Sequence, residues 1–275
     1  MPALITPFDA DERIDVNAHL HNVSTAQSAG AKGILIAGST GEGPYLEPGE
    51  RELLVSRARE TSADLTILCG ISAETDRQAA TQIKEAAAGG ADGVLVVTPG
   101  TLIRSKAAHV NAFYTRISDR SPLPVFLYTV PAITGYELPV ESVRELAGHN
   151  NICGMKDSGG DFTRLEKLSD TLTADFIVYA GKSMALHDSQ ARGAFGAITA
   201  SANYAFTAVH DAASGDATAQ SELTAITGVV ERYGVPGTKF AASLAGMEPG
   251  HSRLPLLPLD ENAKREIRRA ASSER

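Results

Sequence analysis

One lysine and one tyrosine each close an apolar stretch of the chain, and both could take part in carbonyl chemistry. Lys156 follows the residues Ile-Cys-Gly-Met at 152–155, and Tyr128 follows Val-Phe-Leu at 125–127. If these stretches are neighbouring parallel strands of matched height, the amine and the phenol lie close together. An amine that loses its hydration there disfavours its charged form and can attack a carbonyl to form a Schiff base. The phenol could then move protons to and from a substrate oxygen.

Both side chains also have ordinary structural roles to consider. Lys156 could extend its ammonium group to solvent, or it could pair with the adjacent Asp157. Tyr128 could cap the core, with its ring inside and its hydroxyl outside. The two residues together indicate a site more strongly than either does alone.

A third stretch could bind an anion. Residues 38–41, Gly-Ser-Thr-Gly, follow an apolar run and offer two hydroxyl groups and several backbone N–H groups. Small residues let the backbone close on a ligand, and successive N–H groups suit a carboxylate. As a bare pattern it is more often only a turn, which Glu42 could cap or orient.

Short apolar runs that alternate with helical periodicity must position these residues. The runs begin near Ala3, Gly33, Thr66, Gly93, Pro124, Ile152, Phe176 and Gly196. Successive starts are about 28 residues apart, which is enough for a strand, a helix and two short loops. Because the runs are almost wholly apolar, they are typical of parallel strands that are covered on both faces. The pattern predicts an α/β fold, a (β/α)8 TIM barrel whose active groups lie at the carboxyl ends of its strands.

Helices are predicted between the strands at residues 15–29, 48–61, 74–88, 105–118 and 139–147. The last part of the chain is longer than one barrel helix requires, and segments near 223–233, 238–244 and 262–272 predict further helices. We therefore divide the chain into a catalytic barrel at residues 1–220 and a C-terminal helical extension at 221–275 that packs on it. A doubly wound sheet is the competing architecture. The even spacing and the lack of Gly-x-Gly-x-x-Gly after the first strand disfavour it.

Composition excludes several classes of function. Among 275 residues, 25 Lys and Arg stand against 33 Asp and Glu, for a net charge of −8, and no dense basic run suggests a nucleic acid partner. No basic leader or long apolar run suggests a membrane segment, so we expect a cytoplasmic protein. Cys69 and Cys153 are expected to be buried free thiols. The histidines lack the spacing of metal ligands, so no metal site is predicted.

The motifs together resemble the dihydrodipicolinate synthase and N-acetylneuraminate lyase family, which contains pyruvate-handling class I aldolases on a (β/α)8 barrel with a C-terminal helical extension. The matching stretches are residues 3–8, 38–42, 97–99, 128–131 with 134–135, 154–157 and 253–256. They run in the family's order and span nearly the whole chain.

The resemblance implies a role for each site residue. Lys156 would form the imine with pyruvate, and Tyr128 would be the phenol that transfers protons. Ser39 and Thr40 would hold the pyruvate carboxylate. The remaining implied substrate-binding positions are Gly41, Ser158, Gly181, which would shape the floor near the imine, and Ile198. No cofactor or metal is implied, because the imine itself withdraws electrons, and a homo-oligomer, a tetramer or a dimer, is expected.

Three departures from the family bear on the substrate. Ile133 stands where dihydrodipicolinate synthases place an arginine for the second substrate's carboxylate. Residues 183–184, Ser-Met, replace the acidic pair of sialic acid lyases. Residues 100–101, Gly-Thr, replace a tyrosine pair that completes a proton relay, so water or Thr101 must substitute, or catalysis is slower. The segments 154–161 and 131–139 are similar to those of 4-hydroxy-2-oxoglutarate aldolases.

We therefore predict a lyase that reversibly cleaves a 4-hydroxy-2-oxo acid, of the 4-hydroxy-2-oxoglutarate or 2-keto-3-deoxy sugar acid type, to pyruvate and an aldehyde. A dihydrodipicolinate synthase-like condensation and a dehydratase that uses the same imine remain open alternatives. A non-catalytic pyruvate-binding relative is a third.

Overall fold

The computed structural model describes residues 1–103, 106–161 and 163–272. Seven parallel strands form one sheet in which each strand pairs with its neighbours in chain order. The strands are β1 (Gly33–Ile36), β2 (Thr66–Ile71), β3 (Gly93–Val97), β4 (Val125–Thr129), β5 (Ile152–Asp157), β6 (Ile177–Ala180) and β7 (Gly196–Ala197). They coincide with seven of the eight apolar runs read from the sequence.

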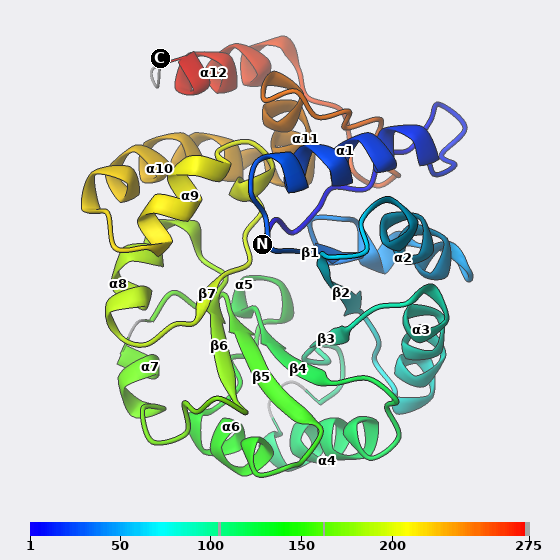
Figure 1. Cartoon of the computed structure of the whole chain (residues 1–275), viewed down its shortest axis with the longest axis vertical. Helices are drawn as coiled ribbons and strands as arrows, with labels where there is room; N and C mark the ends of the chain where they lie inside the picture. Colours follow the sequence, from blue (N-terminus) through cyan, green and yellow to red (C-terminus); the bar gives the residue numbers. More distant parts are fainter. Residues whose placement is uncertain (104–105, 162, 273–275) are drawn as a thin grey trace.

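The remaining run, near Ala3, is the N-terminal segment, and it closes the ring of strands. Pro2 makes a parallel bridge to Thr199, just beyond β7, and Ala3 makes one to Leu35 in β1. The segment therefore lies between the two ends of the sheet (Figure 1). The side chain of Asn203 holds this segment in place. Its amide accepts a hydrogen bond from the Ile5 N–H at 3.2 Å and donates one to the Ala3 carbonyl at 2.7 Å. The predicted (β/α)8 barrel is confirmed.

Helices surround the sheet and continue into the extension. They are α1 (Val16–Ser28), α2 (Glu50–Thr61), α3 (Asp76–Gly89), α4 (Ala107–Ser118), α5 (Pro131–Thr134), α6 (Val140–Ala147), α7 (Thr163–Lys167), α8 (Leu186–Ala191), α9 (Phe206–Ala213), α10 (Ala217–Val230), α11 (Gly234–Leu244) and α12 (Glu261–Ser272). Short 3-10 turns are η1 (Gly43–Tyr45), η2 (Ser183–Ala185), η3 (Ser201–Asn203) and η4 (Glu231–Tyr233).

The five interstrand helices predicted from the sequence are α1 to α4 and α6. Asp15 caps α1 by accepting a hydrogen bond from the Ala18 N–H at 3.0 Å, as residues of this type do at helix starts. The predicted start of α4 at Ser105 lies outside the described residues. The helices α5, α7, α8 and α9 were not predicted, because they have at most eight residues and so show little periodicity.

Apolar side chains pack in three layers. One cluster fills the space between the sheet and the outer helices. A second fills the barrel interior and consists of Ala3, Leu35, Leu68, Leu95, Tyr128, Val130, Tyr179 and Ile198. The third joins α8, α9 and β7 to α10 and α11 of the extension, so the extension packs on the barrel (Figure 1). Residue 220, at which the sequence analysis divides the chain, lies within α10.

The two cysteines differ from the prediction in one respect. Both are free, and Cys69 is buried, but Cys153 at the start of β5 is only half-buried. Among the helices that the structure describes, none is both long and apolar enough to span a membrane.

The closure of the barrel predicts a specific loss of stability. In Asn203→Ala, the buried Ile5 N–H and Ala3 carbonyl lose their partner, so the free energy of unfolding should fall by about 2–3 kcal/mol. Urea unfolding monitored by circular dichroism measures it. Asn150→Ala, at an exposed loop position, is the control and should change the value by less than about 0.5 kcal/mol. Equal values for the two variants would show that closure does not depend on Asn203.

Candidate active site

Lys156 and Tyr128 face each other across neighbouring strands inside the barrel. They are register partners in the pairing of β4 with β5, so the matched strand ends expected from the sequence are present. Lys156 is 5% exposed and Tyr128 is 6% exposed. The Lys156 Nζ atom lies 4.6 Å from the centroid of the Tyr128 ring. A primary amine is therefore held against a phenol in a site largely closed to water.

The two structural roles considered for Lys156 are both contradicted. Its side chain is buried and does not extend to solvent. Asp157 does not pair with it, because Asp157 accepts hydrogen bonds from the Arg164 Nε atom at 2.9 Å and from the Gly159 N–H at 2.7 Å. Successive residues of a strand point to opposite faces, so Lys156 faces the barrel interior and Asp157 the helix layer. No hydrogen bond or ion pair reaches the Lys156 amine from the part of the chain that the structure describes.

A glycine and a bulge set this register. The pairing of β4 with β5 shifts between Val125 and Phe126, so Cys153 is the extra residue of a bulge. A Cβ atom on Gly154 would lie 2.2 Å from the carbonyl oxygen of Ile177 in β6. Only glycine fits this close approach, and it fixes the strand two residues before Lys156.

Hydrogen bonds from Thr98 hold the backbone of Tyr128. Its carbonyl accepts hydrogen bonds from the Thr98 N–H at 3.0 Å and the Thr98 hydroxyl at 2.9 Å. The Tyr114 hydroxyl of α4 forms a hydrogen bond with the Thr98 hydroxyl at 2.9 Å and donates one to the Val96 carbonyl at 3.0 Å. Burial raises the pKa of Tyr114, so this phenol stays neutral. In the sequence, Thr98 stands out only as part of the motif at residues 97–99, and this contact with Tyr128 was not predicted.

Gly181 and Ser158 lie beside the lysine stem. A Cβ atom on Gly181 would lie 2.8 Å from Lys156 Cε and 2.1 Å from the Ser158 Oγ atom. The Gly181 N–H donates to the Asp157 carbonyl at 2.6 Å, which keeps this backbone against β5. Gly181 therefore lies against the end of the Lys156 stem, and Ser158 lies against Gly181. Ile198 is different, because it is fully buried in the interior cluster with Tyr128.

The turn at residues 38–41 lies on the opposite wall. Three strands separate β1 from β5 in one direction around the ring, and β6, β7 and the N-terminal segment separate them in the other. Ser39 and Thr40 are half-buried, and Gly41 is buried. Within the described residues, the backbone N–H groups of these three residues have no hydrogen-bond partner. They are available to an anion.

The turn has an unusual backbone. Ala37 and Glu42, on either side of it, both have φ of 56°, in the left-handed region that non-glycine residues avoid. Such residues cost about 1–3 kcal/mol each and persist only when their surroundings enforce them. Inside the turn, the Gly41 carbonyl accepts a hydrogen bond from the Thr6 hydroxyl at 2.7 Å, and a Cβ on Gly41 would lie 2.7 Å from the Leu4 carbonyl oxygen. The N-terminal segment, through Leu4 and Thr6, therefore packs against the turn at Gly41.

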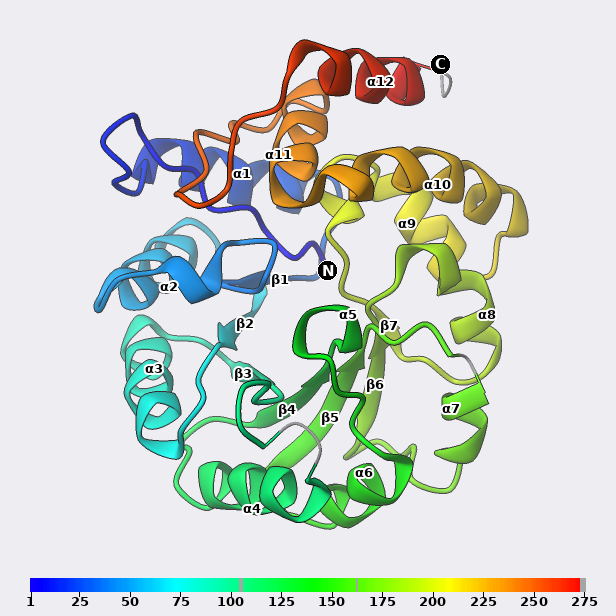
Figure 2. The same cartoon turned by 180° about the vertical axis from the view of Figure 1, so that it is seen from behind.

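The residues that depart from the family lie around the carboxyl ends of the strands. α5, which carries Ile133, lies over the centre of the ring (Figure 2), and Ile133 is 65% exposed. Met184, in η2 after β6, is 47% exposed. The N–H groups of Gly100 and Thr101 donate to the Glu74 carboxylate at 3.3 and 3.0 Å. Within the described ranges, no three His, Cys, Asp or Glu residues are placed to hold a metal ion.

Comparison with known proteins gives a consistent set of relatives. A sequence profile of the dihydrodipicolinate synthetase family matches residues 1–274. A 4-hydroxy-tetrahydrodipicolinate synthase from Methanosarcina mazei is 33% identical over 272 residues, which cover 95% of this chain and 92% of the relative.

Two solved structures share the whole fold. The chloride-inhibited dihydrodipicolinate synthase of Acinetobacter baumannii, complexed with pyruvate, has a TM-score of 0.92 at 28% identity, covering 98% of this chain and 96% of that one. YagE from E. coli K12, a prophage protein of the dihydrodipicolinic acid synthase family in complex with pyruvate, has a TM-score of 0.91 at 26% identity, covering 99% and 96%.

The pairing of Asp157 predicts the effect of removing its partner. Arg164 is 4% exposed and also donates to the Leu138 carbonyl at 2.7 Å. Arg164→Met leaves a largely buried carboxylate without its counterion, so the free energy of unfolding should fall by about 3–5 kcal/mol. Arg144→Met is the matched control, because Arg144 pairs with Asp170 at 3.4 Å on the surface, and its loss should cost less than about 1 kcal/mol. Urea titration compares them, and a small loss for Arg164→Met would contradict the assignment.

Proposed function

The chain belongs to the dihydrodipicolinate synthetase family of class I aldolase-type carbon–carbon lyases, and we propose that it reversibly cleaves a 4-hydroxy-2-oxo acid to pyruvate and an aldehyde. The observation that carries the proposal is the buried amine of Lys156 against the ring of Tyr128, with no carboxylate partner among the residues that the structure describes. A primary amine held in this position can add to the carbonyl carbon of a ketone and form an imine.

The reaction balances with these two side chains. The Lys156 amine adds to the C2 ketone of the substrate and water leaves, which gives a protonated imine. The Tyr128 oxygen takes the proton of the C4 hydroxyl as the C3–C4 bond breaks, and the imine receives the bonding electrons as an enamine. The aldehyde leaves, and C3 of the enamine takes up a proton from water. Addition of water to the protonated imine then releases pyruvate, the free amine and one proton.

The phenol must release its own proton when it takes up the one from the C4 hydroxyl. The tyrosine pair that the family resemblance leads one to expect is replaced by Gly100 and Thr101, so we assign this step to water or to the Thr101 hydroxyl. Thr101 is exposed to solvent, and its N–H donates a hydrogen bond to the Glu74 carboxylate. Its backbone is therefore held in place while water can reach its side chain, which supports this assignment.

The opposite wall supports the recognition of a 2-oxo acid. Ser39, Thr40 and Gly41 offer unpartnered N–H groups and hydroxyls to the substrate carboxylate, whereas the ketone lies next to Lys156. Ser158 and Gly181 border the imine, and Ile198 forms apolar floor beneath it.

A dihydrodipicolinate synthase-like condensation is the second candidate, because the Methanosarcina mazei relative bears that activity in its name. It would use the same imine. Ile133, exposed at the mouth, offers no hydrogen-bond donor to a second carboxylate, and this favours cleavage of a 4-hydroxy-2-oxo acid. Coupled assays with several 4-hydroxy-2-oxo acids, and a condensation assay with pyruvate and aspartate semialdehyde, separate these reactions. A dehydratase would consume the 4-hydroxy-2-oxo acid without releasing an aldehyde. A non-catalytic pyruvate-binding relative would show no turnover in either assay.

We also place the enzyme in the cytoplasm as a homo-oligomer, a tetramer or a dimer. The full-length likeness to dihydrodipicolinate synthases supports this. The changed residues at 100–101 alter a segment that the family resemblance links to a subunit contact. Light scattering gives the oligomeric state.

Imine formation predicts a covalent product. Treatment with pyruvate and borohydride should reduce the imine and add one pyruvyl group to Lys156, and mass spectrometry detects it. The adduct should be absent in Lys156→Ala. The control is Lys182→Ala, because Lys182 lies at the end of the next strand but its side chain is 44% exposed and pairs with Glu231. An unchanged mass in the native enzyme would reject imine chemistry.

Proton transfer by Tyr128 predicts a loss of rate without a loss of binding. In Tyr128→Phe, the ring against Lys156 remains but the hydroxyl is gone, so kcat should fall by about 10²–10⁴ while the pyruvate adduct still forms. Steady-state kinetics with a cleaved 4-hydroxy-2-oxo acid measures it. A kcat near that of the native enzyme would contradict the assigned role.

A further inference from the structure

A buried ionic cluster joins the turn at residues 38–41 to the C-terminal extension. Glu42, directly after the turn, is 1% exposed. Its Oε1 atom lies 2.5 Å from the Nζ atom of Lys239 in α11, and its Oε2 atom accepts a hydrogen bond from the Arg253 N–H at 2.9 Å. Both partners lie about 200 residues further along the chain and belong to the extension. The turn is therefore tied to a distant part of the fold.

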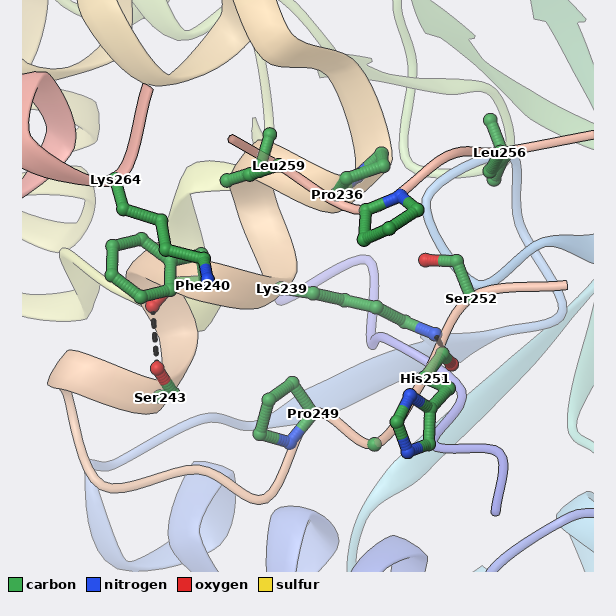
Figure 3. A pocket seen from close by; sticks show the side chains of 12 residues that line it. Pro236, Lys239, Phe240, Ser243, Pro249, His251, Ser252, Leu256, Leu259 and Lys264 are labelled. Atoms are coloured by element: carbon green, nitrogen blue, oxygen red, sulfur yellow. Dashed lines mark hydrogen bonds between the residues drawn. The ribbon is translucent and has the colours of Figure 1, made fainter. Parts of the chain in front are cut away.

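The partners of Glu42 are themselves firmly placed. Lys239 is 4% exposed and also donates to the His251 carbonyl at 2.5 Å, and Figure 3 shows its stem running along the wall of a pocket in the extension towards His251. The Arg253 side chain binds both oxygens of Glu50 at 2.6 Å. Lys239 and Arg253 also face the ring of Phe8, at 5.0 and 4.2 Å. The carboxylate of Glu42 thus meets two anchored groups.

This cluster explains how the strained turn persists. The left-handed φ of Glu42 is unfavourable for a residue other than glycine, so contacts with the rest of the fold must stabilise this conformation. The ion pair and the Arg253 N–H fix the side chain of Glu42, and with it the backbone that ends the turn. The three unpartnered N–H groups at Ser39, Thr40 and Gly41 precede this fixed point.

We propose that Glu42 and Lys239 are positioning residues, through which the C-terminal extension holds the turn in the geometry that receives the substrate carboxylate. This inference rests on the proposed function, because it takes the turn as the carboxylate site. Neither residue touches the reacting atoms, and Lys156 and Tyr128 are held by the sheet instead. Loss of the pair should therefore weaken recognition of the carboxylate and leave the amine intact.

The test compares two ketones that differ in the carboxylate. Borohydride trapping on Lys156 is measured against the concentration of pyruvate and, separately, of acetone, which has no carboxylate. The double variant Glu42→Gln/Lys239→Met removes both charges together, which avoids the cost of a single unpaired buried charge. The half-saturating concentration should rise about tenfold or more for pyruvate, the loss expected for one hydrogen bond to a charged group, and stay within about twofold for acetone.

Lys264→Met is the matched control, because Lys264 lines the same pocket but pairs with Glu261 on the surface (Figure 3). It should leave both half-saturating concentrations unchanged. If the double variant does not fold, Glu42→Gln/Lys239→Gln, which also removes both charges but keeps a donor near the His251 carbonyl, is compared in the same way, with the same expected ratio. An equal rise for both ketones, or no rise for pyruvate, overturns the positioning role. Absence of any pyruvate adduct in the native enzyme is a different result, which rejects the proposed function itself.

Discussion

The register of β5 is the constraint on which the site depends. Adjacent side chains of this strand point to opposite faces, so Lys156 lies inside the barrel and Asp157 lies in the helix layer with Arg164. A slip of one residue would place the carboxylate inside and the amine beside Arg164, where two cations would repel each other. Gly154 and the bulge at Cys153 prevent this slip, since only a glycine fits against the Ile177 carbonyl.

The interior that receives Lys156 gives it little electrostatic support. The surrounding cluster is apolar, and the π face of Tyr128 is the group that approaches the amine. Such a face compensates only a small part of the hydration that a buried ammonium loses. The position of the Lys156 amine therefore depends on packing against this ring and not on an ion pair with a described residue.

The sequence predicted the barrel because its signal is periodic and local, and it predicted the meeting of Lys156 with Tyr128 because parallel strands end at one edge. Short elements such as α7 and α8 have too few residues to show a period. The possible pairing of Lys156 with Asp157 was wrong for a reason available from the strand alternation itself. The contacts of Thr98 with Tyr128, and of Glu42 with Lys239, join residues far apart in the chain, and no pattern in one sequence specifies such pairs.

The two walls of the site therefore have different sources of rigidity. The amine and the phenol sit on consecutive paired strands, and their separation follows from sheet geometry that any sequence able to form this barrel reproduces. The turn at residues 38–41 has no such pairing, and its left-handed ends are held by the N-terminal segment on one side and by the extension on the other. Under the proposed positioning role, changes in the extension would alter the binding of a carboxylate at the turn, while the sheet would still hold the Lys156 amine in place. Under the proposed function, the exposed side chains of Ile133 and Met184 form a third region that would face the aldehyde portion, so that chemistry, acid recognition and aldehyde choice would lie on separately supported parts of one fold.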